Sequence, residues 1–302
     1  VTTTNARAIG KVFCDSPLVR KFSFTGSTEV GKTLGAACVG STVKRISLEL
    51  GGNAPLLVFA DADLDQAVKG AIASKFRNAG QTCVAPDYAL VPTPLVERFV
   101  EACRRATAAF YPKLATNPQF TSIINDRQFR RLSACIEDAR SSGATVHRLH
   151  DEAVDAERRR LTPVALTGVS DSMRVMQEEI FGPLLPIVGY DSIDEAIAYV
   201  NARPRPLALY YFGAADSERD AVLARTVSGG VTVNNTAFHV VQESLPFGGV
   251  GPSGMGHYHG RAGFDTFSKL KPVYIDGRLS ASLLLLPPYG RKFRAILRLL
   301  NR

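Results

Sequence analysis

The sequence has few cysteines, and none is placed as a paired ligand. Its 302 residues hold five, an odd number, widely spaced and without a CxxC pair. A disulfide framework needs an even set, and a zinc site needs closely spaced ligands. This pattern argues against both, predicts no metal site and favours a reducing compartment. The five cysteines are Cys14, Cys38, Cys83, Cys103 and Cys135.

Long apolar runs and a signal-peptide pattern are absent as well. Residues 283–286 are four leucines, but Pro287 and Pro288 end the run. A helix needs about 20 apolar residues to span a bilayer. We therefore expect a cytoplasmic protein.

The excess of positive charge has no concentrated patch in most of the chain. There are 36 Lys and Arg residues against 28 Asp and Glu, a net charge of +8. They are spread out, with clusters only at 158–160, where a solvated face is expected, and at 291–302. We expect no nucleic-acid partner.

Strands and helices alternate from the start of the chain, which predicts an α/β fold built from parallel units. Helices are expected over 6–14 and 28–40, and strands over 18–25 and 43–50. Two strands are too few for a complete nucleotide-binding sheet. The chain also begins at Val1 without a Met, so we expect the N-terminus to be a cut edge.

A second α/β domain follows, with expected domain bounds of 1–51, 52–247 and 248–302. Its expected strands are 55–59, 88–91, 144–149, 161–169, 207–213 and 230–235, and its expected helices are 63–76, 93–111, 125–141, 191–203 and 217–226. In the last segment, KPVYID (271–276) is a strand candidate. Residues 291–300 form a basic amphipathic helix, which favours packing on another subunit over adhesion to a membrane surface.

Two residues far apart in sequence are candidates for chemistry. Glu49 ends an apolar run and precedes Gly51 and Gly52, and Cys83 closes a polar loop of small residues. A thiol near a base is a nucleophile, and a carboxylate in a partly apolar site can activate water. By themselves, however, most cysteines are core residues and most glutamates are surface residues.

GSTEVGKT (26–33) matches the Walker A pattern between an expected strand and helix. The alternative function is thus a P-loop NTPase, with Lys32 on phosphate and Thr33 on magnesium. Glu29 argues against it, because it would put negative charge in a phosphate loop. The same turn can bind a dinucleotide through backbone N–H groups instead.

Three further patterns are weaker. GVGPSG (249–254) matches GxGxxG outside a βαβ context and is interpreted as a flexible turn. His257 and His259 have no further ligand nearby, which favours packing or surface roles. Glu179 and Phe181 precede a Gly–Pro turn and would suit a ribose and a nicotinamide, although a surface Glu and a core Phe are the simpler interpretation.

Taken together, FTGSTEVGK, LELGGN, FRNAGQTC, EEIFGP, NN and LPFGG occur in one order in one chain. This set resembles the aldehyde dehydrogenase superfamily over essentially all 302 residues. Residues 1–83 are similar to succinate-semialdehyde dehydrogenases. Residues 84–302 are similar to class 3 and coniferyl aldehyde dehydrogenases.

The resemblance implies a catalytic domain of that family with a partial Rossmann-type cofactor domain, a cofactor of NAD or NADP, an aldehyde substrate and a homodimer. It implies that Cys83 is the nucleophile, forming a thiohemiacetal and then a thioester, and that Glu49 activates the hydrolytic water. The implied cofactor residues are Gly26 and Ser27 at the pyrophosphate, Val30 near the adenine, Leu50 near the nicotinamide, Glu179 on its ribose and Phe181 beside it. Phe247 would line the aldehyde tunnel.

The resemblance also implies a missing part. In the family, a long N-terminal portion carries most of the nucleotide-binding sheet and the side-chain Asn of the oxyanion hole. The sequence therefore predicts an enzyme whose activity is impaired in this chain, or a non-catalytic fragment that keeps the fold. The choice between NAD and NADP depends mainly on the missing portion.

Overall fold

The computed structural model describes residues 5–153, 155–278, 280, 286–287 and 289–301. The chain divides into two compact units, one ending at Phe267 and one beginning at Ser268. The domain boundaries expected after residues 51 and 247 stay predictions.

A three-stranded sheet begins the first unit. Helix α1 (Ala6–Asp15) precedes β1 (Lys21–Thr25), and α2 (Thr28–Thr42) connects β1 to its parallel neighbour β2 (Arg45–Glu49). The other edge of β2 pairs antiparallel with β10 (Gly254–Met255). The sequence around 249–254 is therefore more than a flexible turn, since Gly254 joins the sheet. Its φ is +151°, and a Cβ there would come within 2.3 Å of the Leu48 carbonyl oxygen, so only glycine fits.

A seven-stranded sheet forms the centre of the same unit, in the order β5-β6-β7-β4-β3-β8-β9. All neighbours are parallel except β5 and β6, which pair antiparallel as a hairpin-like edge. The strands are β3 (Pro55–Val58), β4 (Tyr88–Pro92), β5 (Thr145–Arg148), β6 (Val164–Thr167), β7 (Leu184–Tyr190), β8 (Ala208–Phe212) and β9 (Gly230–Val233).

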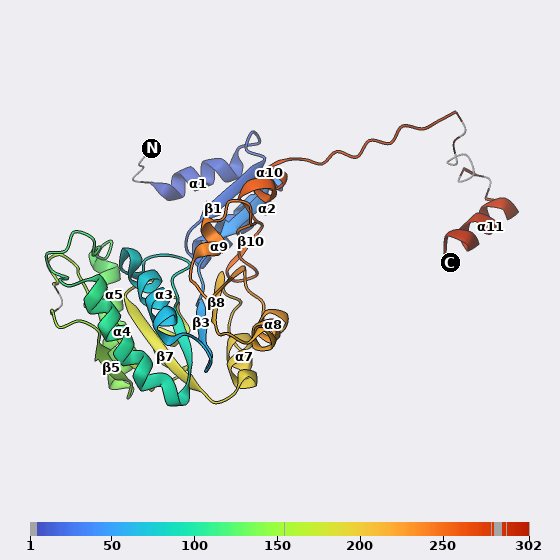
Figure 1. The fold of residues 1–302 in the computed structure, drawn as a ribbon. Coiled ribbons are helices and arrows are strands. Elements are labelled where there is room, and N and C mark those ends of the chain that lie inside the picture. The colour runs from blue at the N-terminus through green and yellow to red at the C-terminus, as the bar shows by residue number, and fades with distance from the viewer. Residues whose placement is uncertain (1–4, 154, 279, 281–285, 288, 302) are drawn as a thin grey trace. The chain divides into compact units, whose positions relative to one another are not determined.

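Helices pack on both faces of this sheet (Figure 1). Helices α3 (Leu64–Phe76) and α4 (Val96–Phe110) lie side by side on one face. Helices α5 (Asp126–Ser141), α7 (Ile193–Asn201) and α8 (Asp216–Arg225) contribute to the core on the other. The shorter elements are η1 (Arg77–Gly80), η2 (Thr93–Leu95), α6 (Arg174–Gln177), α9 (Phe238–Val241) and α10 (Gly260–Phe267).

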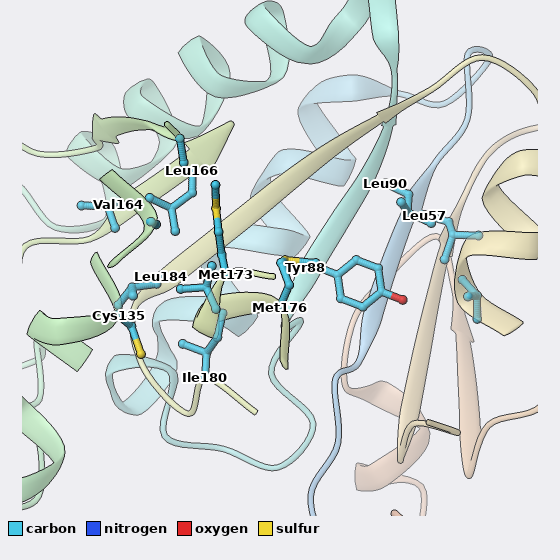
Figure 2. Close-up of a cluster of buried hydrophobic side chains, with 14 of the residues drawn as sticks. Leu57, Tyr88, Leu90, Cys135, Val164, Leu166, Met173, Met176, Ile180 and Leu184 are labelled. Atoms are coloured by element: carbon cyan, nitrogen blue, oxygen red, sulfur yellow. The ribbon is translucent and has the colours of Figure 1, made fainter. Parts of the chain in front are cut away.

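Alternation along the strands produces two cores. Leu57 and Leu90 point into one cluster, shown in Figure 2, while Leu56 and Ala89 point into the other. Strands covered on both faces appear in sequence as continuous apolar runs, which is why β3, β4 and β8 were predictable. Helix starts follow local rules too, since the Asp63 side chain accepts from the Gln66 N–H at the start of α3.

Strand β7 is the longest strand, yet the sequence did not predict it. Pro183 precedes it and Pro186 lies inside it, paired with Leu166 of β6. Proline lacks an N–H, so its presence argues against an interior strand. Here the burial of Leu184, Leu185 and Ile187 outweighs the lost donor.

The second unit contains helix α11 (Arg291–Leu300), which confirms the predicted basic amphipathic helix. Residues 271–276, expected as a strand, have no regular secondary structure. Within the part of the chain that the structure describes, no strand pairs with them to supply a ladder of hydrogen bonds. The leucines at 283–285 lie outside the described residues. Among the described residues, no helix combines the length and apolar character needed to cross a membrane.

Candidate active site

Three neighbouring parallel strands bring the candidate residues together. Strands β7, β4 and β3 are adjacent in the sheet. Each candidate lies a few residues before one of these strands: Glu49 before β3, which starts at Pro55, Cys83 before β4, which starts at Tyr88, and Glu179 before β7, which starts at Leu184. Because parallel strands begin at the same edge of a sheet, the three segments meet at one edge. The Asp87 N–H fastens two of them by donating to the Ala54 carbonyl at 2.7 Å.

Glu49 is a buried carboxylate at the end of β2, between Thr25 of β1 and Gly254 of β10. Its side chain is 2% exposed, and neither carboxylate oxygen has a hydrogen-bond partner. Burial raises the pKa of Glu49 to about 8. The carboxylate form, whose population grows as the pH rises toward 8, can take a proton from water.

The turn before α2 lies beside this carboxylate. The Gly26 N–H donates to the Glu49 carbonyl at 3.0 Å. Ser27 occupies the N-cap of α2 without a side-chain cap, so the first N–H groups of the helix are available to an anion. The buried Leu50 side chain packs on Gly31, where an added Cβ would come within 2.5 Å of it.

The P-loop interpretation fails on this geometry. Helix α2 already begins at Thr28, so residues 28–33 are helical and do not form a loop around phosphates. Lys32 lies on the helix surface, 3.6 Å from Glu29. The charge that argued against the Walker A match is therefore paired with the lysine that the match requires.

Cys83 follows a tightly wound loop. Asn78 and Ala79 have positive φ, and Gly80 has φ +77° with the Gly182 carbonyl against it. Gln81 holds the loop, because its amide donates to the Ser122 carbonyl at 3.1 Å and accepts from the Ile124 N–H at 2.9 Å. The thiol is half-buried.

The electrostatic surroundings of Cys83 include both carboxylates. Burial is the main cause of its raised pKa, and the charges of Glu179 and Glu49 raise it further. The N–H groups of Cys83 itself and of Val84 oppose this by donating to the sulfur.

Glu179 lies against the glycine pair that follows Glu49. A Cβ on Gly51 would fall 1.9 Å from its Oε2 atom, so the carboxylate occupies space that only glycine leaves open. Burial and the nearby Asp87 raise the pKa of Glu179 to about 7, while the Gly52 N–H lowers it. The segments of Glu49 and Glu179 are thus in direct contact.

A buried ion pair behind Glu179 was missed from the sequence. Lys75 is fully buried and lies 3.5 Å from Asp87, which also accepts from the Ile180 N–H at 3.1 Å. Arg131 donates to the Glu179 and Ile180 carbonyls. Ile180 is anchored in the core shown in Figure 2. The one signal for this ion pair in the sequence is Lys75, a lysine among the apolar residues of the helix that becomes α3.

Burial pulls the charges of this pair toward neutrality. It lowers the pKa of Lys75, which Asp87 partly restores, and it raises the pKa of Asp87 to about 6. The Lys75–Asp87 pair is therefore part of the protein interior. It positions the Glu179 segment and does not bind a ligand from solvent.

Two predicted cofactor residues are more open. Val30 is 47% exposed on α2, and Phe181 is 39% exposed with a φ of +48°. The structure brings Gly26, Ser27 and Leu50 near Glu49, and Glu179 near Gly51.

Phe247 lies in an aromatic cluster. Its ring is 4% exposed, stacks on His259 at 5.6 Å and meets Tyr258 edge-on at 5.5 Å. His259 thus has a packing role, as expected. His239 lies 6.2 Å away, and burial lowers its pKa to about 4. Among the described residues, no group of three His, Cys, Asp or Glu side chains could hold a metal.

Comparison with known proteins accounts for this arrangement. The aldehyde dehydrogenase family matches residues 1–273. A probable coniferyl aldehyde dehydrogenase of Pseudomonas aeruginosa is 49% identical over 273 residues, covering 90% of this chain and 56% of that protein. That match is longer than the part of the chain that follows Cys83, so it spans both halves of the composite resemblance.

Two other comparisons agree. A dimeric NADP-preferring aldehyde dehydrogenase of Rattus norvegicus is 41% identical over 258 residues, 85% of this chain and 55% of that protein. The substrate-bound structure of Staphylococcus aureus AldH aligns with a TM-score of 0.85 at 36% identity, covering 96% of this chain and 62% of that one. The chain spans little more than half the length of the curated relatives that it matches. It belongs to the aldehyde dehydrogenase family.

Proposed function

We propose that this chain carries the thiol and the base of an NAD- or NADP-dependent aldehyde dehydrogenase, which oxidises an aldehyde to a carboxylic acid. The observation that carries the proposal is the meeting of Glu49, Cys83 and Glu179 where the chain enters β3, β4 and β7. Both carboxylates act on the thiol electrostatically, and Glu49 has two buried oxygens without a partner.

The residues present fit one part of a dinucleotide. The uncapped start of α2 suits the pyrophosphate, with Gly26 and Ser27 as the turn. The Glu179 carboxylate, which now accepts from Gly52, suits the hydroxyl groups of a ribose. Leu50 and Phe181 would flank the nicotinamide, and Val30 the adenine. When bound, the nicotinamide supplies the acceptor for the hydride.

The protein's own groups carry the remaining steps. The Cys83 thiolate attacks the aldehyde carbon, and the new oxyanion accepts from the backbone N–H groups at Cys83 and Val84. Collapse of this thiohemiacetal expels hydride and leaves a thioester on Cys83. Glu49 then takes a proton from water, whose oxygen attacks the thioester carbon; the C–S bond breaks, the acid leaves and the Cys83 thiolate is regenerated.

The surroundings of the thiol favour an aromatic aldehyde. Cys83 packs against the core cluster that contains Phe247, with Tyr258 and Ala237 at its margin. A cavity of about 630 Å³ opens between α3 and residues 234–238. Its lining combines Phe110, Phe212 and Phe238, which would accept a flat ring, with charged side chains such as Asp65, Lys69 and Arg77. Cys83 is not among its lining residues, and the cavity adjoins the cluster beside the thiol through Phe212 and Ala237. The coniferyl name of the Pseudomonas relative agrees with this substrate class.

The test is formation of reduced cofactor from cinnamaldehyde by the purified chain, with NAD⁺ and NADP⁺ in parallel. We expect a signal that disappears in Cys83→Ala and persists in Cys135→Ala, which removes a buried thiol elsewhere. A chain that gives no signal, yet whose Cys83 is freely alkylated, would favour the non-catalytic alternative. Light scattering of the same samples tests the proposed dimer.

A further inference from the structure

Helices α1 and α2 meet through a matched pair of cysteines that the proposed reaction does not use. The sulfur atoms of Cys14 and Cys38 lie 3.4 Å apart, and these two residues are 1% and 0% exposed. Cys14 is the one buried residue of α1, all of whose residues are described. The attachment of α1 to the rest of the unit thus centres on this sulfur contact.

The contact faces of the two helices explain the close approach. Gly10 and Cys14 are four residues apart on α1, and Leu34 and Cys38 are four apart on α2, so each pair lies on one helical face. A Cβ on Gly10 would come within 3.2 Å of Leu34, which leaves little room for a larger residue. Small side chains on α1 therefore let its backbone come close enough for the sulfurs to touch.

A buried lysine fixes the same junction. The Lys44 ammonium group donates to the Ser16 carbonyl, just past the end of α1, at 2.6 Å. Its charge favours the thiolate of Cys38, but burial and the Cys14 thiol raise the pKa of Cys38 to about 11. Cys38 is therefore slow to react at neutral pH, and because both sulfurs are buried the reaction needs α1 to open locally. Elsewhere on α1, Val12 and Phe13 are 62% and 44% exposed, so little of the helix other than Cys14 is buried.

We propose that Cys14 and Cys38 are a disulfide-forming site that locks α1 onto α2 when the protein meets hydrogen peroxide. One thiolate attacks a peroxide oxygen, breaking the O–O bond and giving a sulfenic acid and water. The second thiolate attacks that sulfur, forming the S–S bond and releasing a second water. Two thiols lose two electrons and two protons, and the peroxide gains them.

Little movement is needed. A disulfide brings the sulfurs to about 2.0 Å, a change that side-chain rotation can supply when the helices already touch. Because α2 begins at the Gly26–Ser27 turn, the bond would tie α1 to the helix that carries the proposed pyrophosphate site. The proposed Cys14–Cys38 disulfide does not depend on whether the chain oxidises aldehydes.

The experiment uses the whole chain treated with hydrogen peroxide, then unfolded, alkylated and mapped by mass spectrometry. We expect a Cys14–Cys38 cross-linked peptide that dithiothreitol removes. In the oxidised protein, amide hydrogen exchange in α1 should slow by roughly tenfold or more, because the tether opposes local opening. Cys83→Ser carries the same test without the half-buried Cys83 thiol and should give the same cross-link.

Cys14→Ala and Cys38→Ala should each lose the cross-link, whereas Cys135→Ala should keep it. Recovery of Cys14 and Cys38 as alkylated thiols from the unmutated chain, under conditions that oxidise Cys83, would overturn the proposal. A cross-link between Cys83 and either cysteine would overturn it too. Neither result requires a variant to fold.

Discussion

The two sheets of the first unit hold their residues in opposite ways. The seven-stranded sheet is covered on both faces, and every residue of β4 and β8 is buried. No residue of β1 is buried, and Val39 and Val43 beside it are 61% and 81% exposed. The proposed thiol, Cys83, precedes a strand of the seven-stranded sheet, which is well packed. The proposed base, Glu49, ends a strand of the three-stranded sheet, which is thinly covered. We therefore expect substitutions near the two sheets to alter different measured properties of the protein.

The largest effect should follow Cys83→Ala. The nucleophile is lost, so we expect hydrolysis of an activated ester, which forms the same thioester without a cofactor, to fall by about 10³-fold or more. The thermal midpoint should change little, because the loop is held by Gln81 and not by the thiol. Residual burst acylation in this variant would place the nucleophile elsewhere.

Glu49→Gln tests the proposed base in the three-stranded sheet. We expect deacylation to slow by about 10²-fold or more while acylation slows less, because only the water step needs the base. In the unmutated chain deacylation should rise with pH up to about 8, since the pKa of Glu49 is raised to that value by burial and the base acts when deprotonated. Rapid-mixing measurements across pH separate the two steps. A variant that loses its burst but keeps deacylation would reverse the assigned roles.

Asp87→Asn tests the well-packed side through stability. Lys75 would lose its ion-pair partner while its buried ammonium group is already disfavoured by burial, and removing one partner of a buried pair costs about 3–5 kcal/mol of unfolding free energy. Asparagine can still accept from the Ile180 N–H, so the loss reports the charge. Urea denaturation measures it.

Two companion variants sharpen this measurement. Lys75→Met combined with Asp87→Asn should recover much of the lost stability, because no unpaired charge remains. Glu137→Gln, which removes an exposed ion pair with Arg140, should change nothing measurable. If the double variant were no more stable than Asp87→Asn, the pair would not be the cause.

The same contrast explains what the sequence could reveal. Apolar runs predicted β3, β4 and β8, because a strand buried on both faces has no polar alternation to obscure it. The motif residues Glu49 and Cys83 were found as residue types in a known order. Strand β7 was missed because Pro186 breaks the rule for interior strands.

Contacts between segments that are distant in the sequence could not be predicted either. The Lys75–Asp87 pair, the space at Gly51 and the positive φ of Phe181 follow from how β3, β4 and β7 begin side by side. No local pattern reports that register. Likewise, Cys14 and Cys38 were seen as isolated cysteines until α1 was placed on α2.

The smallest expected effect is on the reactivity of the thiol. The charges of Glu179 and Glu49 raise the pKa of Cys83, but less than burial does. Glu179→Gln removes one charge, so the pKa of Cys83 should fall and the pH profile of iodoacetamide alkylation should move to lower pH. At neutral pH the rate should rise a few-fold, because more thiolate is present. Glu178→Gln is the matched control, since Glu178 is not among the groups that shift the Cys83 pKa. Unchanged alkylation in Glu179→Gln would mean that the Glu179 charge does not act on the thiol. The segments before β3, β4 and β7 would then lie close together without forming one active site.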